Sequence, residues 1–241
     1  MRVFTCTVSL LIIASKSIAQ EPIDHLKLSE QTQENIISVY KDKMGVNLGL
    51  YNGSEYQYSG HNVKGFPYFK SADTLQGSVF YDGNLYDNVP MYYDLVNDEL
   101  VILNYSKDFP IKLVTDKITY FIIDKCKFLK AGKSDLTLPG SSGFYEELYN
   151  NKTGIFAKKE KILRLSAKAE DNTASYVEYR RYFIYADNKM HEVSNEKSVL
   201  KVFQKRKSDL KKFIHVNNLD FKKNFEEAIV KTAQQFDQIG N

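Results

Sequence analysis

Five pairs of turn-forming residues divide residues 46–193 of this chain into short runs of β-branched and aromatic residues. The pairs are Asn52-Gly53, Asp82-Gly83, Asn97-Asp98, Asn150-Asn151 and Asp187-Asn188. Asparagine, aspartate and glycine tolerate the positive φ angles of tight hairpin turns, so such a pair between two strand-like runs indicates a reversal of the chain. The spacing therefore predicts a meander of antiparallel strands over residues 46–193.

Two hairpins and one central strand are the most clearly marked parts of this meander. Asp82-Gly83 and Asn97-Asp98 each separate two runs of strand-forming residues and follow each other closely along the chain. Residues 118–123 alternate in a strand so that both faces carry apolar side chains, which is typical of a strand covered on both sides. We expect this strand near the middle of the sheet.

The segments on either side of the meander are predicted to be helical. Ser29 can cap a helix over residues 29–45, in which apolar residues recur at a spacing of four before Gly45. Residues 197–239 hold two amphipathic stretches, which predict a helical hairpin. We therefore expect an α+β fold: an N-terminal helix, an antiparallel β-meander that forms a twisted sheet or a half-open barrel, and a C-terminal helical hairpin packed on it.

The first residues have the composition of a secretory signal peptide. Arg2 provides a positive start, an apolar run extends from Val3 to Ala14, and Ser17-Ile18-Ala19 offers small residues for cleavage. A spanning helix needs about 20 apolar residues, and no stretch reaches that length, so we expect no transmembrane segment in the mature chain. We expect residues 1–19 to be removed and residues 20–241 to be one exported domain, periplasmic or extracellular.

Loss of this segment changes the charge and the thiol content of the chain. The 241 residues include 33 basic and 30 acidic side chains, and removal of Arg2 and Lys16 leaves 31 basic against 30 acidic ones. A balance this close to neutral is unlike that of a nucleic-acid-binding protein. Cys126 becomes the only cysteine, so the thiol must be buried, bonded to another chain or reactive.

Several motifs carry a resemblance to other proteins. They are Leu50-Tyr51-Asn52-Gly53-Ser54-Glu55-Tyr56, Gly65-Phe66-Pro67-Tyr68-Phe69, Tyr81-Asp82-Gly83-Asn84-Leu85-Tyr86, Val89-Pro90-Met91-Tyr92-Tyr93-Asp94, Gly143-Phe144-Tyr145, Leu148-Tyr149, Lys211-Lys212-Phe213-Ile214 and Leu219-Asp220-Phe221. With them the chain resembles a group of uncharacterised secreted or periplasmic proteins of Bacteroidetes. The resemblance covers most of residues 20–241. It implies an exported bacterial protein and supplies no catalytic residues.

Cys126 is the first candidate for chemistry. It lies between Lys125 and Lys127, whose charges would lower the pKa of a thiol and favour the nucleophilic thiolate. If the preceding strand continues, however, alternation places Cys126 on the same face as Ile122 and Phe128 and turns both lysines to the other face. Free cysteine is commonly buried, so we expect an inert thiol.

The four histidines give no indication of a metal site. They are His25, His61, His191 and His215, and they show none of the spacings typical of metal ligands. We therefore predict no metal and no cofactor. His61, in a loop at residues 59–62, is the best placed for general-base work, but the sequence identifies no partner for it. We assign no catalytic residue.

Aromatic and acidic residues gather around the two marked hairpins. The candidate ligand-binding residues are Tyr81, Asp82, Tyr86, Tyr92, Tyr93 and Asp94, with Asp87 and Asp98 close by. Aromatic rings stack on sugars and carboxylates accept hydrogen bonds from hydroxyls, so this composition is that of a sugar-binding surface. The order of the acidic residues does not match a calcium loop. Hairpin turns and cross-strand tyrosine pairs explain the same residues without a ligand.

Residues 197–223 are locally basic. Nine cationic residues fall in this range, against Asp209 and Asp220: Lys197, Lys201, Lys205, Arg206, Lys207, Lys211, Lys212, Lys222 and Lys223. Such a face suits an anionic glycolipid, a membrane surface or nucleic acid, and export argues against nucleic acid. A solvated helix face opposite an apolar stripe explains the same pattern.

These observations predict an exported envelope protein that is a non-catalytic binding or interaction module. Its partner would be an envelope lipid, a glycan or a protein, since a meander covered by helices can enclose a ligand-binding concavity. The alternative is an envelope hydrolase whose site combines distant residues, with His61 and an aspartate of the hairpins as the starting pair. A purely structural component of a complex would instead expose a large apolar patch.

Overall fold

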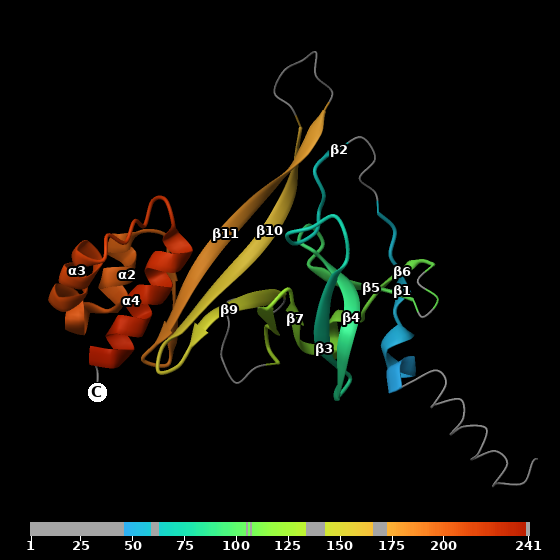
Figure 1. The fold of residues 1–241 in the computed structure, drawn as a ribbon, viewed down its shortest axis with the longest axis horizontal. Helices are drawn as coiled ribbons and strands as arrows, with labels where there is room; N and C mark the ends of the chain where they lie inside the picture. The colour runs from blue at the N-terminus through green and yellow to red at the C-terminus, as the bar shows by residue number, and fades with distance from the viewer. Residues whose placement is uncertain are drawn as a thin grey trace, which may run out of the picture. The chain divides into compact units, whose positions relative to one another are not determined.

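The described part of the chain is a large sheet followed by short helices. The computed structural model describes residues 46–58, 63–104, 106, 108–133, 143–165 and 173–239. They belong to a structural unit that spans Val46–Asn241. They form mostly one mixed sheet of twelve strands, after which come three helices (Figure 1). The predicted signal peptide and the predicted helix over residues 29–45 lie outside the described residues.

The elements follow in this order along the chain. The first are the 3-10 helix η1 (Val46–Tyr51) and the strands β1 (Ser54–Glu55), β2 (Val63–Lys64), β3 (Leu75–Tyr81), β4 (Asn84–Asp94), β5 (Glu99–Leu103) and β6 (Pro110–Lys112). Next come η2 (Thr115–Lys117), β7 (Ile118–Ile123), β8 (Cys126–Lys130), β9 (Phe144–Asn150), β10 (Gly154–Leu165), β11 (Ala174–Ala186) and β12 (Lys189–Val193). The last are α2 (Glu196–Val202), η3 (Gln204–Arg206), α3 (Lys207–Val216) and α4 (Phe225–Ile239).

Hairpins account for most of the sheet. The strands lie in the order β1-β6-β5-β4-β3-β7-β8-β9-β10-β11-β12, and β2 pairs with β11. The β2–β11 pair is parallel, whereas β3–β4 and β4–β5 are the two antiparallel hairpins marked by Asp82-Gly83 and Asn97-Asp98. At the β11–β12 turn, Asp187 and Asn188 have φ angles of 49° and 58°. Aspartate and asparagine adopt this left-handed conformation more readily than most residues.

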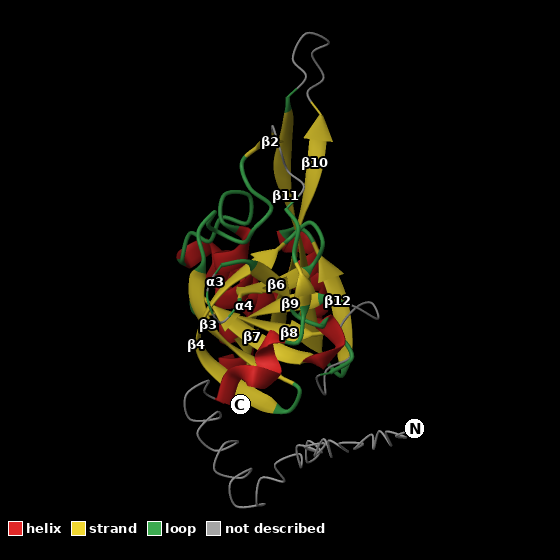
Figure 2. Cartoon of the chain, turned by 90° about the vertical axis from the view of Figure 1, so that its right-hand side faces the viewer, coloured by secondary structure: helices red, strands yellow, loops and turns green. Residues whose placement is uncertain are grey.

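The strands from β4 to β10 return onto themselves. β4 pairs with β3, β3 with β7, and β7 to β10 pair successively. The backbone N–H of Lys161 in β10 then donates to the carbonyl of Leu95, just after β4, over 2.9 Å. This hydrogen bond closes the ring of strands. From Lys158 onward β10 pairs with β11 and no longer with β9, and the two strands extend as a ribbon past the others (Figure 2).

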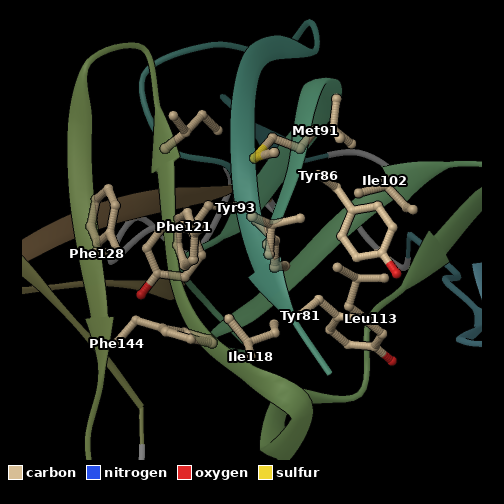
Figure 3. Close-up of a cluster of buried hydrophobic side chains, with 14 of the residues drawn as sticks. Tyr81, Tyr86, Met91, Tyr93, Ile102, Leu113, Ile118, Phe121, Phe128 and Phe144 are labelled. Atoms are coloured by element: carbon tan, nitrogen blue, oxygen red, sulfur yellow. The ribbon is translucent and has the colours of Figure 1, made fainter. Parts of the chain in front are cut away.

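Aromatic side chains fill the space between the strands from β4 to β10. Tyr93 of β4 contacts Phe121 of β7, Phe128 of β8 and Phe144 of β9 at centroid distances of 5.1, 4.9 and 5.9 Å (Figure 3). All four side chains are buried. Edge-to-face contacts of this kind contribute about 0.5–1.5 kcal/mol each beyond the burial of apolar area. The cluster therefore holds β4 against the three consecutive strands β7, β8 and β9.

A second apolar cluster joins the helices to the sheet. It includes Ile155 of β10, Ile184 of β11, Val199 of α2, Leu210 of α3 and Ile229 of α4, all of them buried. The three helices thus pack on β10 and β11 (Figure 1). Within the described residues, no helix is both long enough and apolar enough to cross a membrane.

The predicted fold class is wrong. The described residues form mainly a mixed sheet with short helices at the C-terminal end, and they include no N-terminal helix, since η1 is their first element. The predicted hairpin over residues 197–239 is three helices, because η3 interrupts the chain between α2 and α3. The break allows Phe203 to stack on Phe236 of α4 at 4.5 Å while Leu210 is buried further on. A single stripe of apolar residues does not reveal such a change of direction.

Truncation of Phe121 tests the aromatic core. Phe121→Ala leaves a cavity among the rings of Tyr93, Phe128 and Phe144, so we expect the free energy of unfolding in urea to fall by about 3–5 kcal/mol. Phe109→Ala is the matched control, because Phe109 is 47% exposed. It should change the same quantity by less than about 0.5 kcal/mol. Equal losses in the two variants would contradict this assignment of the core.

Candidate functional site

Four of the six candidate ligand-binding residues do not share an accessible surface. Tyr81, Tyr86 and Tyr93 belong to one buried hydrophobic cluster and are 0%, 4% and 0% exposed (Figure 3). Asp82 lies at the exposed β3–β4 turn, where its carboxylate forms an ion pair with Lys117 at 2.7 Å. The three tyrosines therefore serve the core, and Asp82 serves the turn.

Asp94, the fifth candidate, organises the β4–β5 turn. It is completely buried at the end of β4. Its Oδ2 accepts hydrogen bonds from the Tyr56 hydroxyl at 2.9 Å and from the Asn97 side-chain amide at 2.7 Å. Its Oδ1 accepts a hydrogen bond from the backbone N–H of Val96 at 2.8 Å. Because both oxygens have partners within the chain, the carboxylate is compensated without a ligand.

Tyr92 lies on the other face of β4 from Tyr93, because side chains alternate along a strand. Its ring contacts that of Tyr68 in a tilted arrangement at a centroid distance of 4.5 Å, and Tyr68 contacts Tyr56 and Tyr58 at 6.3 and 6.1 Å. Burial raises the pKa of Tyr68 and of Tyr92, so both hydroxyls stay protonated. The six candidate residues thus fall on different parts of the fold, and ligand binding by Tyr92 stays a prediction.

The thiol of Cys126 is partly buried and has a charged neighbour from a distant segment. Lys70 Nζ donates to Cys126 Sγ at 3.2 Å. Burial and the Glu146 carboxylate nevertheless raise the pKa of the thiol. Sequence adjacency indicated Lys125 and Lys127 as the cations at the thiol, whereas the ammonium group that contacts it belongs to Lys70. The raised pKa is consistent with an inert thiol.

The histidines do not assemble a site within the described part of the chain. His25 and His61 lie outside the described residues. The hydrolase alternative depends on His61, so the structure does not test it. His191 is on β12 and His215 is in the last turn of α3. No group of three or more histidine, cysteine or acidic side chains that could hold a metal occurs among the described residues.

The basic segment, residues 197–223, displays its charge on the surface. All nine of its cationic residues are exposed. Of these nine, only Lys205 forms an ion pair within the described residues, at 3.5 Å from the carboxylate of Asp187. The α2–α3 side of the molecule therefore carries an excess of positive charge that the fold does not neutralise.

An open groove of about 1380 Å³ crosses this basic surface. It lies between the start of α2, the end of α3 and the segment that leads to α4, and we call it the basic groove. Its cationic and apolar lining residues are Lys197, Lys211, Lys222, His215, Ile214, Leu219 and Phe221. Glu196 and Asp220 also line it. Asp220 accepts backbone hydrogen bonds from Lys222 and Lys223, which lower its pKa, so this carboxylate is engaged within its own turn.

Two helix termini shape the basic groove. The Asn195 side chain accepts a hydrogen bond from the backbone N–H of Ser198 at 2.9 Å and so fixes the first turn of α2. At the end of α3, Asn218 adopts a φ of 52°, and the N–H of Leu219 donates to the carbonyl of Ile214 at 3.0 Å. This turn folds apolar side chains back beside α3. The sequence marks the lysines, but not the apolar residues that this turn places among them.

Comparisons with protein-family models, with curated proteins and with solved structures gave no match. A function can therefore be proposed only from the geometry of the described residues.

The reactivity of Cys126 tests its environment. Alkylation by iodoacetamide needs the thiolate, so its rate rises with pH through the pKa of the thiol. Glu146→Gln removes a charge that raises this pKa, and we expect the rate profile to move to lower pH. Lys70→Met removes a charge that lowers the pKa, and the profile should move to higher pH. Mass spectrometry over a pH series measures both rates.

Lys127→Met is the control for this experiment, since Lys127 pairs with Glu147 at 3.1 Å and should leave the profile in place. All variants are compared below their melting temperatures. Coincident profiles for Glu146→Gln and the unmodified protein would contradict the assignment of Glu146.

Proposed function

We propose that the protein is an exported, non-catalytic binding module of the bacterial envelope and that its partner is an anionic lipid held in the basic groove. The observation that supports this proposal is the combination, in one groove, of three exposed lysines with apolar side chains. Cations suit a phosphate headgroup, and apolar side chains suit the adjoining hydrocarbon. The arrangement holds an amphiphile and requires no nucleophile.

The charge argument depends on exposure. A basic side chain near an anionic lipid surface contributes about 1 kcal/mol, and this attraction falls off within a Debye length of about 8 Å at physiological salt. The exposed cations of residues 197–223 outnumber the two acidic residues of that range, Asp209 and Asp220. The attraction is therefore summed over several side chains that face the same partner.

The apolar argument separates a lipid from other anions. Leu219 and Phe221 are half-buried, and they line the groove together with Ile214. Free phosphate or a nucleic-acid backbone would bind the lysines and leave this apolar surface exposed to water, whereas a lipid would cover both the lysines and the apolar surface. The predicted signal peptide would direct the protein to the compartment that contains such lipids.

Vesicle co-sedimentation tests the proposal. We expect the purified protein to bind vesicles that contain phosphatidylglycerol and not to bind vesicles of phosphatidylcholine alone. The triple variant Lys197→Gln, Lys211→Gln, Lys222→Gln should lose about 3 kcal/mol of binding free energy, from about 1 kcal/mol per lysine. Binding should also weaken as salt is added.

A second triple variant separates the groove from general attraction. Lys201→Gln, Lys207→Gln and Lys212→Gln remove the same charge from the same segment, but these three side chains do not line the groove. We expect a smaller loss from this variant. Equal losses would assign binding to diffuse charge, and tight binding to phosphatidylcholine vesicles would reject the anionic lipid.

A further inference from the structure

A second cavity lies at the other end of α2, away from the basic groove. It has a volume of about 540 Å³ and lies between the β9–β10 turn, the β11–β12 turn, the α2–α3 junction and the last turns of α4. It shares no lining residue with the basic groove. Cavities of about 300–1,000 Å³ are the usual size for small-molecule sites.

Two residues that line this cavity carry buried oxygen atoms without hydrogen-bond partners. Asp237 and Thr153 line it and are only 5% and 3% exposed. Asp237 Oδ2 accepts hydrogen bonds from the Tyr149 hydroxyl at 3.0 Å and from the Thr153 backbone N–H at 3.1 Å. Asp237 Oδ1 and Thr153 Oγ1 have no hydrogen-bond partner among the described residues.

An uncompensated buried oxygen is costly, and a buried charge more so. Both atoms can accept a hydrogen bond, and a carboxylate attracts a cation. The wall at Asp237 and Thr153 is therefore suited to a donor group that carries positive charge, such as an ammonium group.

Three basic residues also line the cavity. They are Lys205 and Arg206 at η3, and Lys152 beside Thr153. The Lys205 ion pair with Asp187 is long, at 3.5 Å, and both side chains are 77% exposed, so it binds the lysine weakly. Arg206 donates to the carbonyl of Ile239 at 3.4 Å through one nitrogen of its guanidinium group. Guanidinium has five N–H donors, so Arg206 can still receive a carboxylate.

Apolar side chains complete the cavity. Ala186, Val202 and Phe236 line it, and the Phe236 ring is held in place by its stack on Phe203 at 4.5 Å. A sugar would satisfy the acceptors without using the basic residues, and a simple anion would leave Asp237 Oδ1 without a partner. A ligand with an ammonium group, a carboxylate and an apolar side chain uses all three parts of the lining.

We propose that this cavity binds a small zwitterion, namely an amino acid or a short peptide with an apolar side chain. The ammonium group binds at Asp237 and Thr153, and the carboxylate binds at Lys205 and Arg206. The apolar side chain lies against Phe236. This binding is separate from the lipid binding proposed above and does not depend on it.

Isothermal titration calorimetry with three probes tests the assignment of each charge. The probes are leucyl-leucine, leucyl-leucinamide, which lacks the carboxylate, and N-acetyl-leucyl-leucine, which lacks the ammonium group. The protein used is residues 20–241. We expect leucyl-leucine to bind about tenfold or more tightly than either derivative, because each charge-assisted contact is strong.

Matched variants assign the charges to residues. Asp237→Asn should weaken leucyl-leucine about tenfold and leave the N-acetyl derivative unchanged, since only the former carries an ammonium group. The double variant Lys205→Gln, Arg206→Gln should weaken leucyl-leucine and leave the amide unchanged. Lys201→Gln lies outside the cavity and should change neither.

Thr153→Val guards against misfolding of the Asp237 variant. Valine has nearly the same shape as threonine, so we expect the melting temperature to be kept or raised while the affinity for leucyl-leucine falls. The proposal is overturned if leucyl-leucine does not bind, if the three probes bind equally, or if Asp237→Asn in a folded protein weakens all probes alike.

Discussion

The ion pair between Lys158 and Asp98 holds β10 against the β4–β5 turn, and a shared hydrogen bond connects this pair to the aromatic cluster. The Nζ–Oδ2 distance is 2.6 Å, and the Lys158 side chain is 6% exposed. The hydroxyl of Tyr93 donates to Asp98 Oδ1, also at 2.6 Å. Removal of one partner from such a buried pair leaves an uncompensated charge at a cost of about 3–5 kcal/mol. Tyr93 is the centre of the aromatic cluster. Asp98 thus connects this cluster to β10, because it binds both Tyr93 and Lys158.

The same strand carries the fold from the closed ring to the helices. Ile155 of β10 belongs to the cluster that α2, α3 and α4 bury, while Lys158 faces Asp98 a few residues later. The basic groove and the second cavity, which Asp237 and Thr153 line, lie at opposite ends of α2. Val199 and Leu200 of α2 belong to the same apolar cluster and fix the position of this helix. Both sites thus combine loop and helix-end residues on a scaffold whose position is set by packing. Residues on such segments can vary without loss of the core.

Local patterns in the sequence predict local structure well and the sites poorly. The turn pairs identify hairpins because φ preferences act within two residues. Tyr92 and Tyr93 are adjacent and must point to opposite faces, but only the strand register decides that Tyr93 is inside. The stripe of residues 197–214 predicts helix and conceals the break at η3. Asp237 and Thr153 meet through tertiary packing, and Lys70 reaches Cys126 in the same way, so no spacing could have indicated either contact.

The parallel pairing of β2 with the far end of β11 has a consequence for the order in which the chain acquires its structure. Val63 pairs with Ala174, and β11 is the strand partner of β2 among the described residues, so this pair cannot form until β11 does. Likewise, the hydrogen bond from the Lys161 N–H to the Leu95 carbonyl can form only after β10 has reached the end of β4. Folds dominated by contacts between distant residues form slowly, in about milliseconds to seconds. A chain with this topology therefore keeps early strands such as β2 unpaired until late strands form, and its exposure to proteases and to other chains is greatest during that interval.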